Sequence, residues 1–168
     1  MNTILNVEIL IPIGLLLLQT GIILLIWISI LKKIGIIKKP FDGLEYSHAI
    51  FTSVFILSVL LVATSSAPAM FQTFKTYQSQ NGNLWQLYLY KSSQFFLIIL
   101  FFEVLLGLVL ILFTRTFFAP GNGIKDIVEG SIPSALITSS IVIGFSIALR
   151  IMSSEVVEYL RPQYLNFR

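Results

Sequence analysis

The sequence predicts an all-α polytopic membrane protein with four transmembrane helices. Of its 168 residues, 56% are hydrophobic and only 11% are charged, and the mean hydropathy is +0.89. A soluble domain of this size does not need so much apolar surface. Four runs reach the roughly 20 apolar residues that a spanning helix requires; they cover about residues 9–31, 47–71, 92–113 and 133–151. We therefore expect residues 1–168 to form one membrane domain, with the lipid bilayer as its partner.

The first two runs differ in their polar residues. The first carries Gln19 inside the apolar stretch and ends in Lys32 and Lys33. The residues before it lack the basic segment of a signal peptide, so we expect an uncleaved span. The second run holds Pro68 near its end, where proline is expected to kink or stop the helix.

Aromatic and charged residues flank the last two runs. Trp85, Tyr88 and Tyr90 precede the third run, and such residues favour the headgroup layer. We expect them to be interface anchors, with a ligand cage as the alternative. Arg150 follows about 17 residues into the fourth run, so it is expected to snorkel to the outer interface. The fourth helix is expected to continue to about Leu160, within an amphipathic tail of residues 152–168.

Small residues recur at helical spacing in the second and fourth runs. Ser140, Gly144 and Ala148 follow one another every four residues, which is a small-xxx-small face. Such faces let helices approach closely, within one chain or between chains. We predict helix packing rather than a solute site for these residues: Ala49, Ser53, Ala135, Ser139, Gly144 and Ala148.

The distribution of basic residues predicts the orientation. The first loop is short and early, and it holds Lys32, Lys33, Lys38 and Lys39. Basic residues in short loops favour the cytoplasmic side. We therefore predict that the first and third loops are cytoplasmic and that both termini lie outside.

The two halves of the chain resemble each other. Residues 48–57, HAIFTSVFIL, and residues 134–143, SALITSSIVI, share an Ala, a Thr and a Ser at an offset of 86. At an offset of 84, Gln19 of the first run aligns with Glu103 of the third. We predict two parallel two-helix repeats, about an axis along the membrane normal, covering residues 9–71 and 92–151. Chance similarity between apolar helices is the alternative.

Three features of the sequence together suggest a family. They are the polar lead-in and Ser-Ser-Ala-Pro-Ala exit of residues 43–71, the small-residue pattern of residues 130–151, and the amide of Gln19. With them the chain resembles the YjfL-like family of small bacterial inner-membrane proteins, known as domain of unknown function 350. The resemblance covers about residues 9–151. It implies four spans built from a doubled two-span unit and a place in the bacterial inner membrane. It also suggests a link to envelope stress and supplies no catalytic residue.

Glu103 is the only acidic residue inside a long apolar run. An ionised carboxylate at this depth costs about 2.5–3.5 kcal/mol or more, so it needs a proton, a partner or water. Counting along the helices places Ser58 and Ser140 at its level and Arg150 about 15 Å away. Three interpretations of Glu103, Gln19, Ser58 and Ser140 stay open. They are interhelical hydrogen-bonding groups, or they line a polar path or symmetric pore in which Glu103 titrates, or they form a site for another subunit.

Other chemistry has little support in the sequence. There is no cysteine, one histidine, and no nucleotide-binding or hydrolase motif, so we expect no enzyme, no cofactor and no nucleic-acid partner. Asp42, Glu45 and His48 stand at three-residue spacing, which could suit a metal, but a polar helix start is expected instead.

These features predict a small integral membrane subunit or scaffold. It assembles through its small-residue faces, as a homo-oligomer or with a membrane-complex partner. The alternative is an ion channel or transporter whose path runs past Glu103 and Gln19.

Overall fold

The all-α architecture with four spans is confirmed. The computed structural model describes residues 2–37, 46–78, 85–117 and 122–160, and these residues form helices and short turns without a strand. Four helical segments are long and apolar enough to cross a membrane; they are Leu10–Ile34, Tyr46–Gln78, Trp85–Thr114 and Ile132–Tyr159. The chain is therefore treated below as a multi-pass membrane protein.

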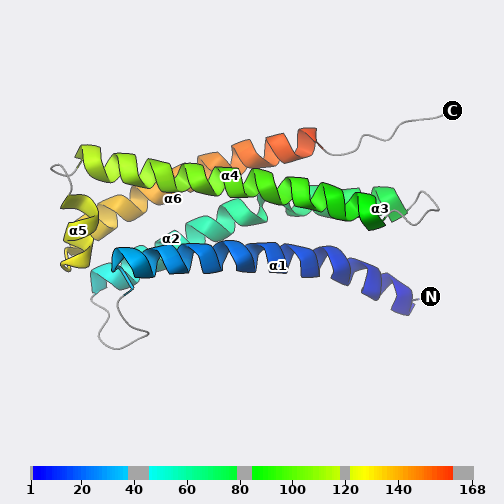
Figure 1. The fold of residues 1–168 in the computed structure, drawn as a ribbon, viewed down its shortest axis with the longest axis horizontal. Helices are drawn as coiled ribbons and strands as arrows, with labels where there is room; N and C mark the ends of the chain where they lie inside the picture. Colours follow the sequence, from blue (N-terminus) through cyan, green and yellow to red (C-terminus); the bar gives the residue numbers. More distant parts are fainter. Residues whose placement is uncertain (1, 38–45, 79–84, 118–121, 161–168) are drawn as a thin grey trace.

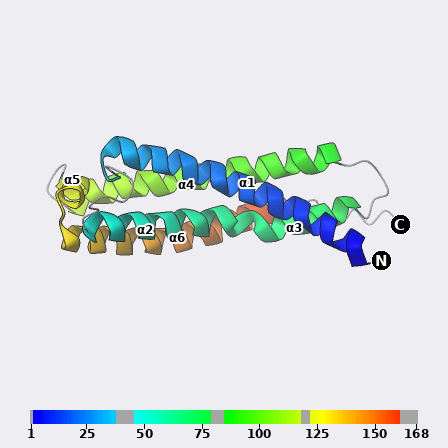
Figure 2. The same cartoon turned by 90° about the horizontal axis from the view of Figure 1, so that it is seen from below.

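The helices lie along one long axis (Figures 1 and 2). In chain order they are α1 (Asn2–Ile34), α2 (Tyr46–Ala63), the 3₁₀ turn η1 (Thr64–Ser66), α3 (Ala67–Gln78), α4 (Trp85–Phe117), α5 (Asn122–Val128) and α6 (Ile132–Tyr159). Helices α1 and α4 run in one direction, and α2, α3 and α6 run in the opposite direction. These directions are the ones that two parallel two-span repeats require, and the repeat itself stays a prediction.

Two glycines end helices at the same end of the bundle. Gly35 has φ 87° and Gly130 has φ 98°, a left-handed conformation that glycine adopts without steric cost. After Gly35, the Ile36 amide donates to the Leu31 carbonyl at 3.1 Å, which closes the last turn of α1. After Gly130, Ser131 caps α6 by accepting a hydrogen bond from the Ser134 amide.

The second span is interrupted as the sequence predicts. Helix α2 stops at Ala63, the 3₁₀ turn η1 follows, and α3 starts again at Ala67 with Pro68 in its first turn. Proline is tolerated there because the amide that it lacks would have no helical acceptor. The break therefore lies just before Pro68, and the span runs on to Gln78.

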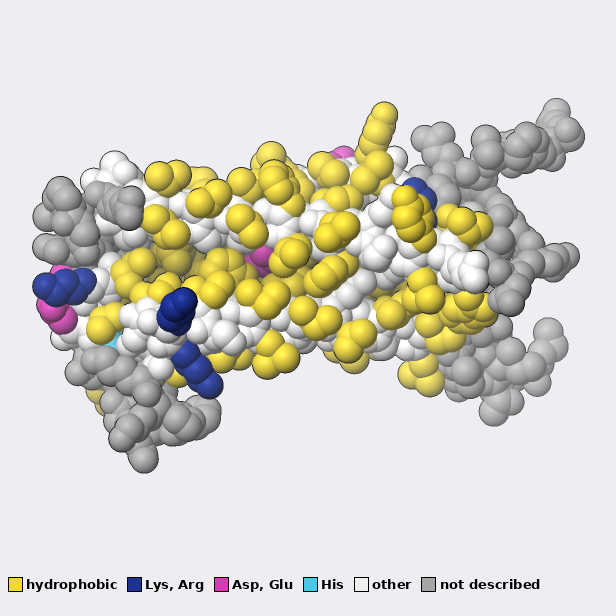
Figure 3. All heavy atoms as spheres, viewed as in Figure 1, with side chains coloured by type: hydrophobic (Ala, Val, Ile, Leu, Met, Phe, Trp, Pro, Cys, Tyr) yellow, Lys and Arg dark blue, Asp and Glu magenta, His cyan; other side chains and the backbone are white. Residues whose placement is uncertain are grey.

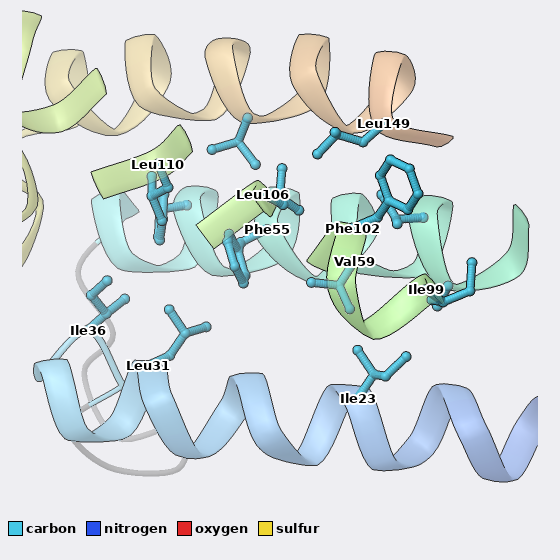
Figure 4. Packing of buried hydrophobic residues seen from close by; sticks show 14 of the residues in the cluster. Ile23, Leu31, Ile36, Phe55, Val59, Ile99, Phe102, Leu106, Leu110 and Leu149 are labelled. Atoms are coloured by element: carbon cyan, nitrogen blue, oxygen red, sulfur yellow. The ribbon is translucent and has the colours of Figure 1, made fainter. Parts of the chain in front are cut away.

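Helices α2, α4 and α6 form most of the core, and α1 covers one side of it. Figure 4 shows Phe55 and Val59 of α2 beside Phe102 and Leu106 of α4, with Ile23 of α1 facing them. Only 11% of the apolar window of α1 is buried, against 39–44% for the other three spans. Helix α1 therefore has the fewest packing contacts to hold it in place.

The outer surface fits a bilayer. On the face drawn in Figure 3, hydrophobic side chains cover the middle, and most charged side chains lie toward the two ends. Helix α5 closes one end, because Ser47 donates to the Ile127 carbonyl at 3.2 Å and His48 Nε2 lies 3.1 Å from the Val128 carbonyl.

Some expectations fall on other parts of the chain. The predicted extension of the last helix is confirmed, since α6 ends at Tyr159 with Leu160 as its C-cap. The helix start expected at Asp42 and Glu45 and the tail beyond residue 160 lie outside the described residues.

Candidate functional site

Glu103 is buried in the bundle and bonded to a tryptophan of another span. Its side chain is 1% exposed, and the Trp27 indole Nε1–H of α1 donates to its Oε2 at 3.2 Å. Glu103 lies about 12 residues from Lys91 and 11 from Thr114, so roughly 16–18 Å from each polar end of its span. The acid therefore joins α1 to α4 in the middle of the apolar zone.

Trp27 is positioned by α2 and by a glycine of α4. Its ring meets the Phe55 ring edge-on, with the centroids 4.9 Å apart. A Cβ on Gly107 would come within 2.5 Å of the Trp27 ring atom Cη2. The indole thus fits only because position 107 has no side chain. Gly107 follows Glu103 by one turn, so the glycine and the acid hold opposite parts of the same ring.

The second carboxyl oxygen of Glu103 has no hydrogen-bond partner among the described residues. Several hydroxyls of the described chain are likewise buried without a partner, on Thr52, Ser58, Thr73, Tyr88, Thr138 and Ser139. Buried polar atoms are usually paired, so such atoms call for an explanation. Glu103 and Ser58 are the two of this set that belong to the predicted intramembrane polar residues.

Gln19 makes the second polar link between α1 and α4. Its Nε2 donates to the Ser92 hydroxyl at 3.0 Å and to the Ser92 carbonyl at 3.2 Å. The prediction that an amide in this span joins helices therefore has a specific partner. Sequence reasoning missed Ser92 and Trp27. A tryptophan inside an apolar run was the available signal for the latter, because a buried indole N–H needs an acceptor.

The expected common depth of Gln19 and Glu103 is wrong. Helices α1 and α4 run in the same direction, and their hydrogen-bonded partners are 73 and 76 residues apart, not 84. Gln19 precedes Trp27 by eight residues, which puts it about 12 Å from the level of Glu103. The sequence offset does not set the relative height of two helices, because packing contacts fix that height.

The even-numbered spans do lie close to the predicted register. Ser153 of α6 donates to the Ser65 hydroxyl at 2.7 Å, across 88 residues. That separation differs from the offset of 86 by two residues, or about 3 Å along a helix. The even spans are therefore matched in height, whereas the odd spans are shifted.

The predicted small-residue positions divide between the inside and the outside of the bundle. Ala135 and Ser139 are buried, and Ala49 is half-buried. Ser53 is exposed in the single chain, so a packing role for it between chains stays a prediction. Ser140 is also exposed and donates to the Leu136 carbonyl of its own helix, so it is not a partner of Glu103.

A continuous strip of α6 faces outward. We name it the α6 outer face, and its exposed residues are Ile137, Ser140, Gly144, Ile147, Ala148 and Ile151. A Cβ added to Gly144 would meet nothing within 4 Å. The small-xxx-small face therefore has no partner within the described residues.

Two of the three predicted aromatic anchors are exposed. Trp85 is 45% exposed and Tyr90 is 59% exposed, at the start of α4. Tyr88 is instead 1% exposed and packs edge-on against Phe74 of α3, with ring centroids 5.1 Å apart. The headgroup role predicted for Tyr88 is corrected, because α3 extends far enough to cover it.

Arg150 is exposed, but it does not lie at the predicted depth. The rings of Phe145 and Phe113 meet with centroids 5.1 Å apart, on helices that run in opposite directions. Figure 4 places Leu149 at the level of Phe102. Arg150 thus lies within roughly 8 Å of the level of Glu103, and not about 15 Å away. Counting from the start of the fourth apolar run overestimated the distance, because that run does not begin at the height at which the apolar run of α4 ends.

Of the three residues whose spacing could suit a metal, the structure describes only His48. Asp42 and Glu45 lie outside the described residues, and His48 is held by the Val128 carbonyl.

The chain matches no family model, no curated protein and no solved structure. Its interpretation therefore rests on the residues and contacts given above.

Proposed function

We propose that this protein is an integral membrane subunit that assembles through the α6 outer face. One observation carries the proposal. Ser140, Gly144 and Ala148, which the sequence predicts as a packing face, are all exposed in the isolated chain. In a bilayer, small residues gain by close helix contact, whereas lipid tails contact small and large side chains about equally well.

The polar residues of the interior support the same role. Glu103 and Gln19 each bond a side chain of a neighbouring span, as interhelical groups do. Such bonds are worth about 0.6–2 kcal/mol each in membrane proteins. They stabilise the subunit, and they leave the outer face of α6 for contact with another chain.

The test is the substitution Gly144→Leu. The position is exposed and a Cβ added there meets nothing within 4 Å, so the fold is expected to persist. The native mass in mild detergent should fall to that of one chain, because leucine would hold the partner helix away. Leu108→Ala on α4, a substitution of an exposed residue elsewhere, serves as the control and should leave the mass unchanged. An unchanged complex in Gly144→Leu would refute the proposal.

A second candidate function has an observation of its own. Glu103 Oε1 and the Ser58 hydroxyl are buried without a partner among the described residues. Unpaired intramembrane polar groups mark ion or proton pathways in many transporters. The candidate is therefore a channel or transporter in which Glu103 exchanges a proton or a cation.

The substitution Glu103→Gln separates the two functions. Glutamine keeps an oxygen for the Trp27 indole but cannot titrate, so the fold and the assembly should be preserved. If reconstituted liposomes show a proton or cation flux that this change abolishes, the second function is correct. If the flux is absent or unchanged, the channel or transporter function is excluded and only the assembly function remains.

The proposal extends to the location of the protein and to the process it serves. The resemblance to YjfL-like proteins supports a place in the bacterial inner membrane and a part in envelope stress. No catalysis is assigned. The partner is a second copy of this chain or another membrane protein. The charged residues beside the α6 outer face favour one of these two, as argued below.

A further inference from the structure

Two charged residues of opposite sign flank the α6 outer face. Arg150 and Glu155 are exposed, and neither forms an ion pair within the part of the chain that the structure describes. They are five residues apart, so they project about 140° from each other around the helix. Ile147 and Ile151, which are 49% and 59% exposed, lie between them.

Arg150 is placed where a lone cation is costly. It lies within roughly 8 Å of the level of Glu103, in the apolar middle of the bundle. An arginine on a lipid-facing surface at this depth costs at least about 2.5 kcal/mol unless it reaches water or an acid. Glu103 does not serve it, since that acid is buried and bonded to Trp27.

The two acids of its own helix are also out of reach, and Glu158 is eight residues away. Residues on one helix contact each other at spacings of three or four, and Glu155 lies five residues on, at the opposite flank. A parallel neighbouring helix changes this geometry. When two identical helices pack in parallel, a flanking residue meets the residue five positions later on the partner helix.

We propose that the α6 outer face binds a second copy of this chain, in a two-fold dimer in which Arg150 of each copy pairs with Glu155 of the other. The inference rests on the proposed function and names its partner. Two copies in one membrane have the same orientation, so their α6 helices are necessarily parallel. Because the dimer has two-fold symmetry, both ion pairs form together. Ser140 and Gly144, at the centre of the contact, allow the two α6 helices to approach closely.

The first experiment is a charge exchange. Arg150→Glu places like charges together, and Glu155→Arg does the same with the opposite sign. Each single change should weaken dimerisation about tenfold or more, because like charges in a contact of low polarity repel strongly. The double exchange should restore the dimer. The readout is the dimer fraction in lipid nanodiscs over a range of protein-to-lipid ratios. If the single changes leave the dimer intact, Arg150 does not pair with Glu155 of a second copy and the proposal is wrong.

The second experiment locates the contact. The chain has no cysteine, so Ile147→Cys introduces a single thiol at the centre of the face. Oxidation should join two copies through it, whereas Leu97→Cys, an exposed position on α4, should give little product. A thiol at position 147 that does not cross-link would refute the second copy as partner.

Failure of the inference differs from failure of the proposed function. If the purified chain is monomeric while Gly144→Leu abolishes a larger complex in native membranes, the face binds a different protein. The second-copy inference is then wrong and the assembly function holds. If Gly144→Leu changes neither the purified chain nor the native complex, both are wrong.

Discussion

The contact of Trp27 with Glu103 depends on the absence of a side chain at Gly107. The indole donates to the acid at 3.2 Å and turns its edge toward Gly107, where a Cβ would come within 2.5 Å. Close-packed interiors tolerate extra atoms poorly, because neighbours have to leave their preferred rotamers. One glycine therefore keeps an indole N–H directed at a buried carboxyl group.

The substitution Gly107→Ala should break this arrangement. The added methyl would displace Trp27, remove the hydrogen bond to Glu103 and lower the free energy of unfolding by about 1–3 kcal/mol. Gly21→Ala on α1 is the matched control, since a Cβ there meets nothing within 4 Å, and it should not lower stability because alanine is at least as favourable as glycine inside a helix. Unfolding in detergent measures both. In a Trp85→Phe background, the emission of Trp27 should also shift in Gly107→Ala. Equal stability of the two variants would contradict the role of Gly107.

For these individual residues, the sequence identified the polar groups but not their hydrogen-bond partners. A carboxyl group and an amide inside apolar runs predict polar contacts, and both residues make them. The partners Trp27 and Ser92 depend on the relative height of α1 and α4, which no local pattern encodes. Tyr88 shows the same limit, because only the length of α3 decides whether it meets headgroups or Phe74.

Helix α1 is the element with the least support from packing. Only 11% of its apolar window is buried, so its polar links to α4 carry more of its attachment than in the other spans. The bond of Gln19 to Ser92 lies toward one end of the α1–α4 contact, and that of Trp27 to Glu103 lies about 12 Å further along. Two separated links fix both the height and the rotation of α1.

A double-mutant cycle tests the first of these links. Gln19→Leu and Ser92→Ala, alone and combined, should show a coupling of about 0.6–2 kcal/mol in the free energy of unfolding. The matched control replaces the neighbouring Ser93, which is exposed and donates to the Tyr90 carbonyl of its own helix. Gln19→Leu with Ser93→Ala should show no coupling. A coupling near zero in the first cycle would mean that packing alone holds this part of α1.

The elements themselves were the most predictable part. Runs of about 20 apolar residues have few alternatives to a spanning helix, because every backbone group has to be satisfied without water. The ends of the elements were less predictable. Helix α4 starts at Trp85, seven residues before its apolar run, since polar residues outside the bilayer continue a helix at little cost.

In the whole molecule, the two halves match in one helix pair and differ in the other. Helices α2 and α6 keep nearly the height that the sequence offset predicts, and their hydroxyls meet at Ser65 and Ser153. Helices α1 and α4 are displaced, so Gln19 and Glu103 bond at different depths. The difference between the halves is thus a shift in height between α1 and α4. The exposed α6 outer face then offers a further contact that the single chain leaves open.

The predicted orientation of the molecule in the membrane can be tested directly. The beginning of α1 and the end of α6 lie at one end of the bundle, and α5 lies at the other (Figure 1). Lys32 and Lys33 end α1 on the α5 side, which basic residues predict to be cytoplasmic. In the cysteine-free chain, Gln78→Cys should therefore react with a membrane-impermeant maleimide in intact cells. Glu129→Cys, next to α5, should react only after the cells are made permeable, and both should react then. The reverse pattern would place the beginning of α1 and the end of α6 on the cytoplasmic side.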